Sequence, residues 1–495
     1  MLTDFETVDP AEFADRVYDV AVIGSGPAGI SLARRLAAKG WTVGLFEGGG
    51  LELSADSQDI YKGDIVGQDY FPLDVPRLRY FGGTSNHWSG WSRRFDTYDF
   101  LPNQLNPLSG WPIGKSDLDP YAPEAASIID LPEAAGAEME GAHEPATQTE
   151  MKKGFDRMGF FYSPPTRFKE KYLGEILRSR NIHLFVNANL VDLKLSKGLS
   201  AASEGLFRGY ARDGAVAVKA RYFALCLGGI ENPRFLLNCN SQIRAGIGNE
   251  NDLVGRFFSE HPHIELGHIT NFFYQRGIEF FIPKKSFLEQ HRVLNFGLRV
   301  KSLLAGGAPK SLMRHAVCLS DFNREAVLML SGKSWLNCEP VLLQIACEQA
   351  LNPDSRVLLG DARDGFGKRR AVLDWRLSPI DFHTMRVAAR EFGRVLAVSN
   401  IGRLKIADWL MEEEPAYPTV DTGQEIGGSH HMCTTRMSDD PKTGVVNADC
   451  RVHGIDNLYI GGSSIFASGG HANPTFSIVQ LALRMGDHLD ARLRG

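Results

Sequence analysis

Residues 18–47 read YDVAVIGSGPAGISLARRLAAKGWTVGLFE, and this stretch decides the fold of the chain. The apolar run that ends at Ile23 predicts a strand, and the glycines that follow it predict a tight turn. The next residues have apolar side chains at helical spacing, which predicts a helix that ends at Gly40. A second apolar run at 41–46 predicts another strand, which closes on Glu47. Strand, turn, helix and strand in this order form the βαβ unit that opens dinucleotide-binding domains.

The turn GSGPAG has glycine where a dinucleotide requires it. Its first glycine permits the tight turn, its second lets the backbone approach a pyrophosphate, and its third lets the helix pack closely on the strand. The amide groups and the dipole at the start of the helix would then face the phosphates. Glu47 stands where an acidic side chain accepts hydrogen bonds from ribose hydroxyls, and the unit by itself does not separate FAD from NAD. The residues expected at the phosphates are Gly24, Gly26, Pro27, Ala28 and Gly29.

The rest of the chain returns to the same sheet. Strand-like runs at 182–195 and 222–227, and a last run at 457–462 before a closing helix, fit the nucleotide-binding sheet. Residues 263–404 mix alternating runs with a helical segment at 379–398. We therefore predict an α/β fold, in which a Rossmann-like domain is interleaved with an α+β substrate-binding domain whose antiparallel sheet is flanked by helices. The predicted segments are 1–65, 181–262 and 426–495 for the nucleotide-binding domain, 66–180 for loops that cover the cofactor together with an insertion of the substrate domain, and 263–425 for the substrate-binding domain.

Composition and charge exclude several classes of protein. The 495 residues include 54 Lys plus Arg against 59 Asp plus Glu, a net charge of −5, without a dense basic block, so nucleic acid and acidic membranes are not expected partners. The first residues lack the basic and apolar regions of a secretory signal, and no apolar run approaches the roughly 18 residues of a membrane span.

The cysteines are Cys226, Cys239, Cys318, Cys338, Cys347, Cys433 and Cys450. They contain no CxxC pair, which argues against a disulfide reductase and predicts reduced thiols in a cytoplasmic protein. The sequence leaves homo-oligomer formation open.

Further motifs follow one another along the chain. They are GGTSNHW at 82–88, WPI at 111–113, LGGIENPR at 227–234, LVGR at 253–256, NPDSRV at 352–357, HHMCTTRM at 430–437, GVV at 444–446 and HANPT at 471–475. With these motifs, the sequence resembles the glucose-methanol-choline (GMC) oxidoreductase superfamily over nearly its whole length. The resemblance implies bound FAD and the oxidation of an alcohol group on a small molecule by hydride transfer to flavin N5. GGTSNHW and the last strand, LYIGG at 458–462, resemble the pyranose oxidase and glycoside oxidase branch, which implies a sugar, glycoside or polyol substrate.

Alcohol oxidation needs a neutral base near the hydroxyl, because the carbon gives up hydride readily only as the hydroxyl proton leaves. By the resemblance, His430 is this base and Asn473 orients the substrate hydroxyl. Histidine suits the role, since its unperturbed pKa of roughly 6.5 leaves it mostly neutral near pH 7. The adjacent His431 is the rival candidate for the base. The sequence shows no spaced Cys, His or acidic partners that would complete a metal site with this pair, so we expect no metal.

The resemblance also implies which further residues contact FAD. They are Gly82, Gly83, Thr84, Asn86, His87, Trp88, Ser89, Val191, Gly228, Gly462, Ser463, Asn473, Pro474 and Thr475. His87 occupies the place of a histidine that can bond covalently to the flavin, and both a covalent bond and a non-covalent contact stay open. Val191 is expected in a strand at 185–195, where its backbone would meet the adenine edge.

The start of the closing helix is expected at the flavin. Pro474 suits the first helical position, which leaves Asn473 as the N-cap, as the amide that faces substrate, or as both. The helix dipole would stabilise the negative charge of a reduced flavin.

Other functions remain compatible with these motifs. An FAD-containing lyase of the same superfamily, similar to a hydroxynitrile lyase, would use the histidine for acid–base chemistry on a cyanohydrin. The substrate could also be an alcohol that is not a carbohydrate. A flavin monooxygenase would share only the amino-terminal fold, and the motifs at 430–437 and 471–475 argue against it. No motif indicates whether oxygen, a quinone or a redox protein accepts the electrons.

Overall fold

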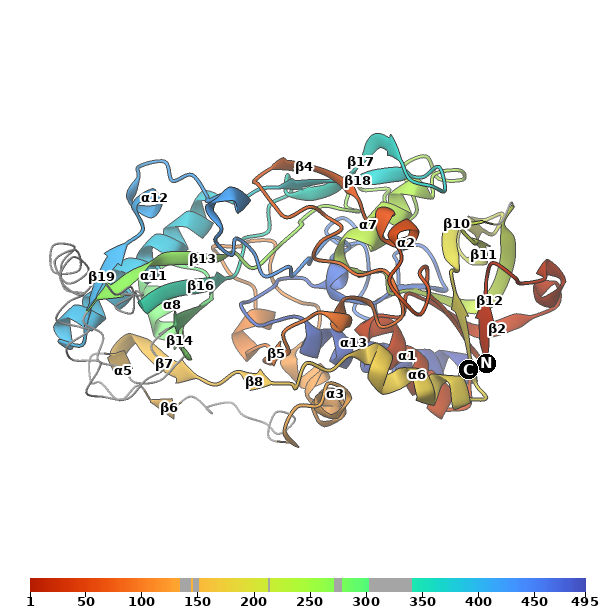
Figure 1. The fold of residues 1–495 in the computed structure, drawn as a ribbon, viewed down its shortest axis with the longest axis horizontal. Coiled ribbons are helices and arrows are strands. Elements are labelled where there is room, and N and C mark those ends of the chain that lie inside the picture. The colour runs from red at the N-terminus through yellow and green to blue at the C-terminus, as the bar shows by residue number, and fades with distance from the viewer. Residues whose placement is uncertain (134–143, 146–150, 212–213, 271–277, 302–340) are drawn as a thin grey trace, which may run out of the picture.

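The computed structural model describes residues 1–133, 144–145, 151–211, 214–270, 278–301 and 341–495. Two large sheets lie toward opposite ends of an elongated molecule (Figure 1). One of them carries the βαβ unit, and the other is antiparallel. This arrangement confirms the predicted α/β fold, with a Rossmann-like domain and an α+β substrate-binding domain.

The nucleotide-binding sheet has a parallel centre. Its parallel strands, in spatial order, are β1 (Leu2–Asp4), β9 (Ile182–Val186), β3 (Val43–Phe46), β2 (Val17–Ile23), β12 (Val216–Leu225) and β20 (Leu458–Ile460). The antiparallel strands β11 (Ala202–Arg208) and β10 (Asn189–Leu195) extend the sheet beyond β12. Because a central parallel strand is covered on both faces, Val20 to Ile23 are all buried and form a continuous apolar run.

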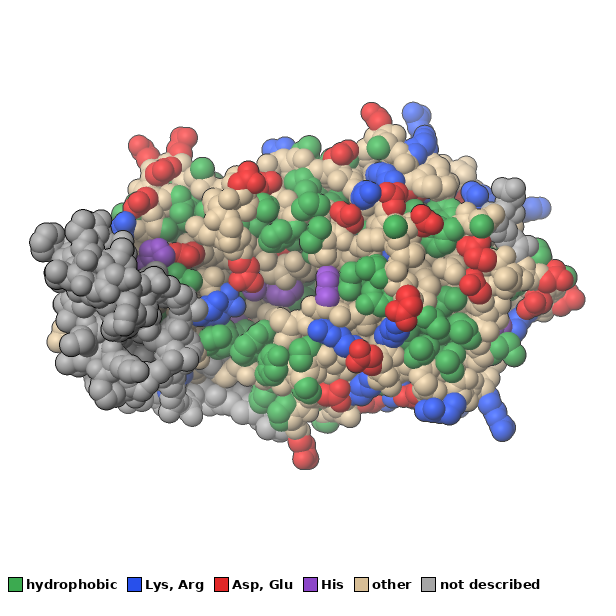
Figure 2. All heavy atoms as spheres, in the orientation of Figure 1, with side chains coloured by type: hydrophobic (Ala, Val, Ile, Leu, Met, Phe, Trp, Pro, Cys, Tyr) green, Lys and Arg blue, Asp and Glu red, His purple; other side chains and the backbone are tan. Residues whose placement is uncertain are grey.

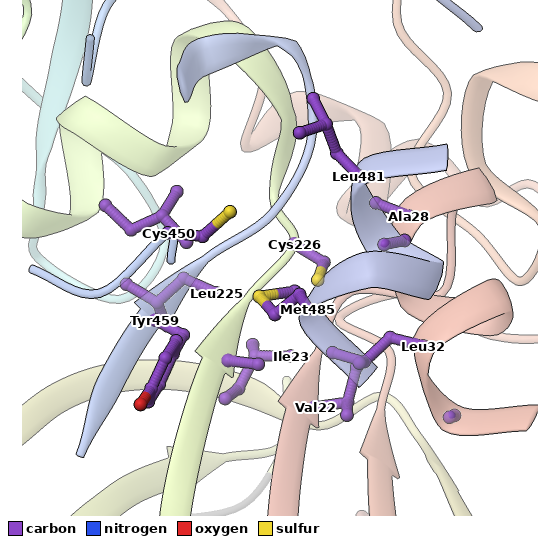
Figure 3. Close-up of a cluster of buried hydrophobic side chains, with 14 of the residues drawn as sticks. Val22, Ile23, Ala28, Leu32, Leu225, Cys226, Cys450, Tyr459, Leu481 and Met485 are labelled. Atoms are coloured by element: carbon purple, nitrogen blue, oxygen red, sulfur yellow. The ribbon is translucent and has the colours of Figure 1, made fainter. Parts of the chain in front are cut away.

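Helices from the two ends of the chain pack together beside this sheet. α1 (Pro27–Ala38) contacts α13 (Thr475–Arg494), and a 2.7 Å ion pair joins Arg35 to Asp487. Figure 3 shows apolar side chains from β2, β12, α1 and α13 that converge in one cluster. The labelled residues are Val22, Ile23, Ala28, Leu32, Leu225, Cys226, Cys450, Tyr459, Leu481 and Met485. The carboxy-terminal helix therefore completes a core that the first βαβ unit begins.

One predicted strand is two strands in the structure. The run expected at 182–195 breaks at Asn187, whose φ of 55° turns the chain between β9 and β10. Val191 lies in β10, so the continuous strand expected at 185–195 is wrong. Asparagine tolerates this left-handed backbone better than most residues do, and no local sequence pattern marks the turn.

The second sheet is antiparallel. Its strands, in spatial order, are β19 (Arg403–Ile406), β13 (His263–Thr270), β16 (Val341–Cys347), β15 (Phe296–Lys301), β14 (Ile278–Pro283), β7 (Phe155–Met158) and β6 (Glu144–Pro145). The helix predicted at 379–398 is confirmed as α11 (Pro379–Val398), which packs against β13, β16 and β19. Alternation along β16 buries Leu343 and Ile345 in the core and turns Gln344 and Ala346 to the other face.

Shorter elements accompany the two large sheets. β17 (Arg356–Arg363) and β18 (Arg369–Trp375) form a sheet with β4 (Gly63–Gly67), and β5 (Trp91–Ser92) pairs with β8 (Phe161–Tyr162). Further described α-helices are α2 (Ala55–Asp59), α3 (Ala122–Ile128), α5 (Met151–Gly154), α6 (Phe168–Arg178), α7 (Gly228–Asn238), α8 (Lys285–His291) and α12 (Asp408–Met411).

Within the described ranges, no helix combines the length and the apolar character that crossing a membrane requires. The cysteines in these ranges are free and buried, and Cys318 and Cys338 lie outside them. The division into five segments stays a prediction.

Candidate active site

A central cavity adjoins a second and a third cavity, one on each side. The central cavity, of about 500 Å³, lies at the carboxyl ends of β2, β3, β12 and β20, where doubly wound sheets bind ligands. The second cavity, of about 290 Å³, shares with it Ser89, Gly428, His430 and Asn473. The third cavity, of about 70 Å³, shares with it Gly48, Tyr61, Arg79 and Leu227. Histidine side chains are visible in a hollow on the face that Figure 2 shows.

The glycine turn is shaped for close approach of a ligand. At Gly24, which has a φ of 103°, a Cβ atom would lie 2.4 Å from the carbonyl oxygen of Cys226. A Cβ atom at Gly29 would lie 1.8 Å from the Gly24 carbonyl oxygen. Gly26 differs, because nothing lies within 4 Å of its missing Cβ and its bare backbone lines the central cavity. Since no side chain caps α1, its first amide groups are left for an anion such as a pyrophosphate.

Glu47 ties the end of β3 to the glycine turn. One oxygen of its buried carboxylate accepts hydrogen bonds from the Ser25 amide, at 3.1 Å, and from the Ser25 hydroxyl, at 2.6 Å. The other oxygen accepts a hydrogen bond from the Gly49 amide at 2.9 Å. Glu47 also lines the central cavity, and its contact with ribose hydroxyls stays a prediction.

The third cavity contains Val191 and a half-buried arginine, Arg79, that the sequence analysis missed. Val191 lines this cavity beside Leu227, away from the glycine turn. The Arg79 guanidinium donates a hydrogen bond to the Tyr210 hydroxyl and lies against Gly48, where a Cβ atom would approach it to 2.4 Å. Arg79 lines both the central and the third cavity, so it places a positive charge between them. Its signal in the sequence is the pair of arginines just before GGTSNHW.

The predicted cofactor residues separate into two groups by position. Those that line the central cavity are Gly24, Gly26, Pro27, Ala28, Glu47, Gly83, Thr84, His87, Trp88, Ser89, Gly228, Gly462, Ser463, Asn473, Pro474 and Thr475. Gly29, Gly82 and Asn86 do not line it. Gly82 has a φ of 95° and Asn86 donates a hydrogen bond to the Phe81 carbonyl at 3.0 Å, so these two residues shape the loop.

The start of α13 borders the same cavity. Pro474 is the N-cap residue and Thr475 the first helical residue, so the predicted helix start is one residue early. Asn473 is not the N-cap, and that interpretation is wrong. Its side-chain amide instead donates a hydrogen bond to the Trp91 carbonyl at 3.0 Å. No side chain caps α13, whose first amide groups therefore remain available to the central cavity.

His430 lies in the wall between the central and second cavities. Its backbone amide donates to both oxygens of the buried Glu260 carboxylate, at 2.8 and 3.0 Å. Its Nδ1 atom lies 2.9 Å from Nδ1 of His261. Burial lowers the pKa of His430 well below its ordinary value, and the neighbouring imidazoles add to the shift. A neutral imidazole at this place can accept a proton.

His431 is placed differently from His430. It lines the central cavity but not the second one. Its Nε2 atom lies 3.0 Å from the Tyr70 hydroxyl, which itself donates to Glu260. Because that hydroxyl proton is already used, His431 donates to Tyr70 and is held in a buried network. Burial lowers the pKa of His431 to about 3. The geometry thus favours His430 over His431 as the base.

His261 and His263 are functional candidates that the sequence analysis missed. Together with His430 they form a group whose ring nitrogens lie within 4.8 Å of one another, and such a group could hold a metal ion. The premise that no histidine partners surround His430 was therefore wrong. Nδ1 of His261 and Nδ1 of His430 already share a hydrogen bond with each other. The motif EHPH at 260–263 is the signal that could have drawn attention to them.

The second cavity has an aromatic wall and a polar wall. Trp91 packs against Phe160 and Phe280, with ring centroids 6.1 and 5.5 Å apart. On the polar side, Arg299 forms a 2.7 Å ion pair with Glu425 and donates a hydrogen bond to the side-chain amide oxygen (Oε1) of Gln344 at 2.9 Å. Cavities that combine apolar walls with a few fixed polar groups are typical of small-molecule sites.

Comparisons with known proteins bear on the family and the fold of the chain. The family model of the GMC oxidoreductases matches residues 352–482, which include the HHMCTTRM and HANPT motifs. The chain is 22% identical to 2-methyl-1,2-propanediol dehydrogenase of Mycolicibacterium austroafricanum, over 96% of this chain and 95% of that protein. It is 25% identical to paromamine 6'-oxidase of Streptomyces fradiae, over 95% of this chain and 91% of that protein.

The chain shares its fold with a solved alcohol oxidase, and part of its sequence matches a pyranose oxidase. A fungal aryl-alcohol oxidase has the same fold, with a TM-score of 0.63 and 13% identity over 97% of this chain and all of that one. The match to pyranose 2-oxidase of Tricholoma matsutake is partial: 26% identity over 138 residues, which cover 26% of this chain and 23% of that protein. The pyranose oxidase resemblance therefore concerns a segment of the chain, whereas the wider family resemblance spans nearly all of it.

The glycine turn, the uncapped helix starts and the adjoining cavities also fit FAD. Taken together, these findings show that the chain is an FAD-dependent alcohol oxidoreductase that carries a GMC oxidoreductase domain at residues 352–482.

Proposed function

We propose that this protein oxidises an alcohol group of a sugar, glycoside or polyol, and that His430 takes the hydroxyl proton while Asn473 orients the hydroxyl. The observation that carries the proposal is the place of both side chains in the wall shared by the central and second cavities. FAD bound in the central cavity supplies the acceptor of the hydride. A substrate in the second cavity would have its reacting carbon beside His430 and Asn473.

The two side chains have complementary hydrogen-bonding capacities. Neutral His430 has a lone pair that can take the hydroxyl proton, and this transfer lowers the barrier for hydride loss from the same carbon. Asn473 uses one N–H to bond the Trp91 carbonyl, which leaves a second N–H and the amide oxygen for the substrate hydroxyl. The fixed amide therefore orients the hydroxyl toward the base.

The cofactor is proposed to span the central and third cavities. The amide groups at Gly26 and the start of α1 would bind the pyrophosphate, and Oε1 of Glu47 has one spare lone pair for a ribose hydroxyl. Val191 would border the adenine in the third cavity. The start of α13 would lie at the flavin, where its dipole favours negative charge. Arg79, between the two cavities, would neutralise phosphate charge.

The substrate class follows from the walls of the second cavity. The aromatic wall suits the apolar face of a ring, while Arg299, Gln344 and Glu425 offer charged and neutral hydrogen-bonding partners to several hydroxyls. Relatives that are named as a diol dehydrogenase and as a paromamine oxidase support a small substrate with several polar groups.

His87 is the residue at which the flavin would be bound either covalently or by a packing contact. It lines the central cavity, where either a covalent bond or a packing contact with the flavin is compatible with its position. Precipitation of the holoenzyme in acid distinguishes the two forms, because only covalently bound flavin stays with the protein pellet. The same treatment of His87→Ala is the control.

Anaerobic mixing of the yellow holoenzyme with a panel of alcohols tests the proposed function. Sugars, glycosides or polyols should bleach the flavin absorbance, because hydride reaches the cofactor. Bleaching by simple aliphatic or aromatic alcohols alone would contradict the substrate class and leave the mechanism intact. A lyase would convert a cyanohydrin without bleaching, and that result would contradict the oxidation itself.

A further inference from the structure

His261 connects the proposed base to the backbone of a distant loop. Its imidazole is fully buried, with Nδ1 at 2.9 Å from Nδ1 of His430 and Nε2 at 3.1 Å from the carbonyl oxygen of Gly469. Three segments that lie far apart in the sequence therefore form one line of hydrogen bonds. This line ends at the wall shared by the central and second cavities, where His430 lies.

The position of each proton in this line follows from the hydrogen-bonding groups. A carbonyl oxygen only accepts, so Nε2 of His261 carries a proton and donates it to Gly469. Burial lowers the pKa of His261 to about 3, so the ring is neutral and its Nδ1 has a lone pair. The proton between the two Nδ1 atoms then belongs to His430. Neutral His430 with a proton on Nδ1 has its lone pair on Nε2.

We propose that His261 is a positioning residue that fixes the tautomer of His430, so that Nε2 of His430 is the atom that takes the substrate proton. The inference rests on the proposed role of His430 and goes beyond it, because it assigns the reacting atom and the group that selects it. As the hydroxyl O–H bond breaks, the N–H bond forms at Nε2, and the electron pair of the C–H bond leaves as hydride, for which bound FAD would supply the acceptor. His430 is then an imidazolium whose Nδ1–H still points at the lone pair of His261. Such a charge-assisted hydrogen bond is stronger than the neutral one, so it favours proton transfer.

Glu260 fixes the backbone of His261 and the backbone of His430 relative to each other. Its carboxylate accepts a hydrogen bond from the His261 amide at 2.8 Å and from the His430 amide at 2.8 and 3.0 Å. The Tyr70 hydroxyl donates to the same carboxylate. Since Glu260 is fully buried, both histidine backbones are fixed to one rigid group. The contact between the rings is thus part of a defined network.

Two amide substitutions separate the two hydrogen bonds of His261. In His261→Asn the amide oxygen takes the place of Nδ1, so an acceptor for His430 remains and the bond to Gly469 is lost. In His261→Gln the amide nitrogen takes the place of Nε2, so the bond to Gly469 remains and the acceptor for His430 is lost. The measurement is the limiting rate of flavin reduction, together with the apparent substrate Kd, in anaerobic stopped flow. Visible absorbance and thermal unfolding of both holoenzymes show whether FAD binding and folding are unchanged.

We expect His261→Gln to lower the limiting rate about 10- to 100-fold at an unchanged substrate Kd, as the loss of a hydrogen bond to a charged group does. His261→Asn should stay within about fivefold of the parent enzyme, because the acceptor remains. Equal losses in both variants, or a larger loss in His261→Asn, would overturn the proposal.

A spectroscopic measurement on the parent protein gives the same answer without relying on either variant. In ¹⁵N spectra of the histidine-labelled holoenzyme, with His430 assigned by the signals that disappear in His430→Gln, Nδ1 should carry the proton and Nε2 should not. The opposite tautomer contradicts the proposal. His430→Ala separates its failure from that of the proposed function. If His430→Ala reduces flavin as fast as the parent enzyme, the role of His430 is wrong. If only the two His261 variants show no difference, the role of His261 alone is wrong.

Discussion

The side-chain amide of Asn473 donates a 3.0 Å hydrogen bond to the backbone carbonyl of Trp91, although 382 residues separate the two in the sequence. The bond joins the segment before α13 to the strand β5. Both residues also line the second cavity, so one contact links the start of a cofactor-facing helix to the aromatic wall of the proposed substrate site.

Asn473→Ala should lower the rate of flavin reduction by about 3- to 10-fold, because it removes one orienting hydrogen bond. FAD should stay bound, since the glycine turn is untouched. Stopped-flow reduction with a saturating alcohol measures the effect. A loss as large as that of His430→Ala would show that Asn473 does more than orient the hydroxyl.

His430→Ala should lower the rate of flavin reduction by about 10²- to 10⁴-fold, as expected for a lost general base. His431→Ala is the matched control, because His431 lines the central cavity and not the second one. Both variants should remain yellow. If His431→Ala gives the larger loss of rate, His431 and not His430 is the base. If neither variant lowers the rate, another group takes the substrate proton.

Substitutions in the glycine turn should separate cofactor binding from folding. Gly26→Ala should fold normally but bind FAD more weakly, since its Cβ atom would meet no protein atom within 4 Å and would project from a residue that lines the central cavity. Gly24→Ala should instead lower the stability of the apoprotein by about 1 to 2 kcal/mol or more, because of its positive φ and its contact with the Cys226 carbonyl. Flavin absorbance after gel filtration and thermal unfolding of the apoproteins measure the two effects. Equal FAD affinity of Gly26→Ala and the parent protein would contradict the pyrophosphate assignment.

The contribution of the buried Glu348 to stability should fall as the pH rises from 5 to 8. Burial raises the pKa of Glu348 to about 7, whereas an unfolded glutamate titrates near roughly 4.3. Between these values the folded state binds more protons than the unfolded state, so the contribution of Glu348 to stability is present at low pH and is lost as the pH passes through about 7. The free energy of unfolding of the parent protein, minus that of Glu348→Gln, should therefore decrease from pH 5 to pH 8, as thermal unfolding of both proteins at each pH measures. The exposed Glu250→Gln is the control, and a difference between the parent protein and Glu348→Gln that stays the same from pH 5 to pH 8 would contradict the prediction.

Local sequence determined the elements that create the cofactor site. The glycines at 24–29 are needed by a turn whose geometry depends on neighbouring residues only, so the sequence was sufficient to predict the strand, turn, helix and strand around them. The helix at 379–398 was also predicted with its observed bounds, since helical periodicity is a local pattern. The boundary between β9 and β10 was missed because a single left-handed residue, Asn187, turns the chain.

The tertiary structure alone decided which side chains meet at the proposed base. His261 and His430 are 169 residues apart, and their contact depends on how the antiparallel sheet packs against the loop before the closing strand. Tyr70 and Gly469 join this network from still other parts of the chain, and Glu260, which precedes His261, binds both Tyr70 and the His430 amide. The sequence by itself determined that the chain carries a dinucleotide-binding unit and a candidate histidine base, because short contiguous motifs predict both. The partner that fixes the proton on that histidine came only from the fold, because a hydrogen bond between distant segments depends on packing that no local pattern records.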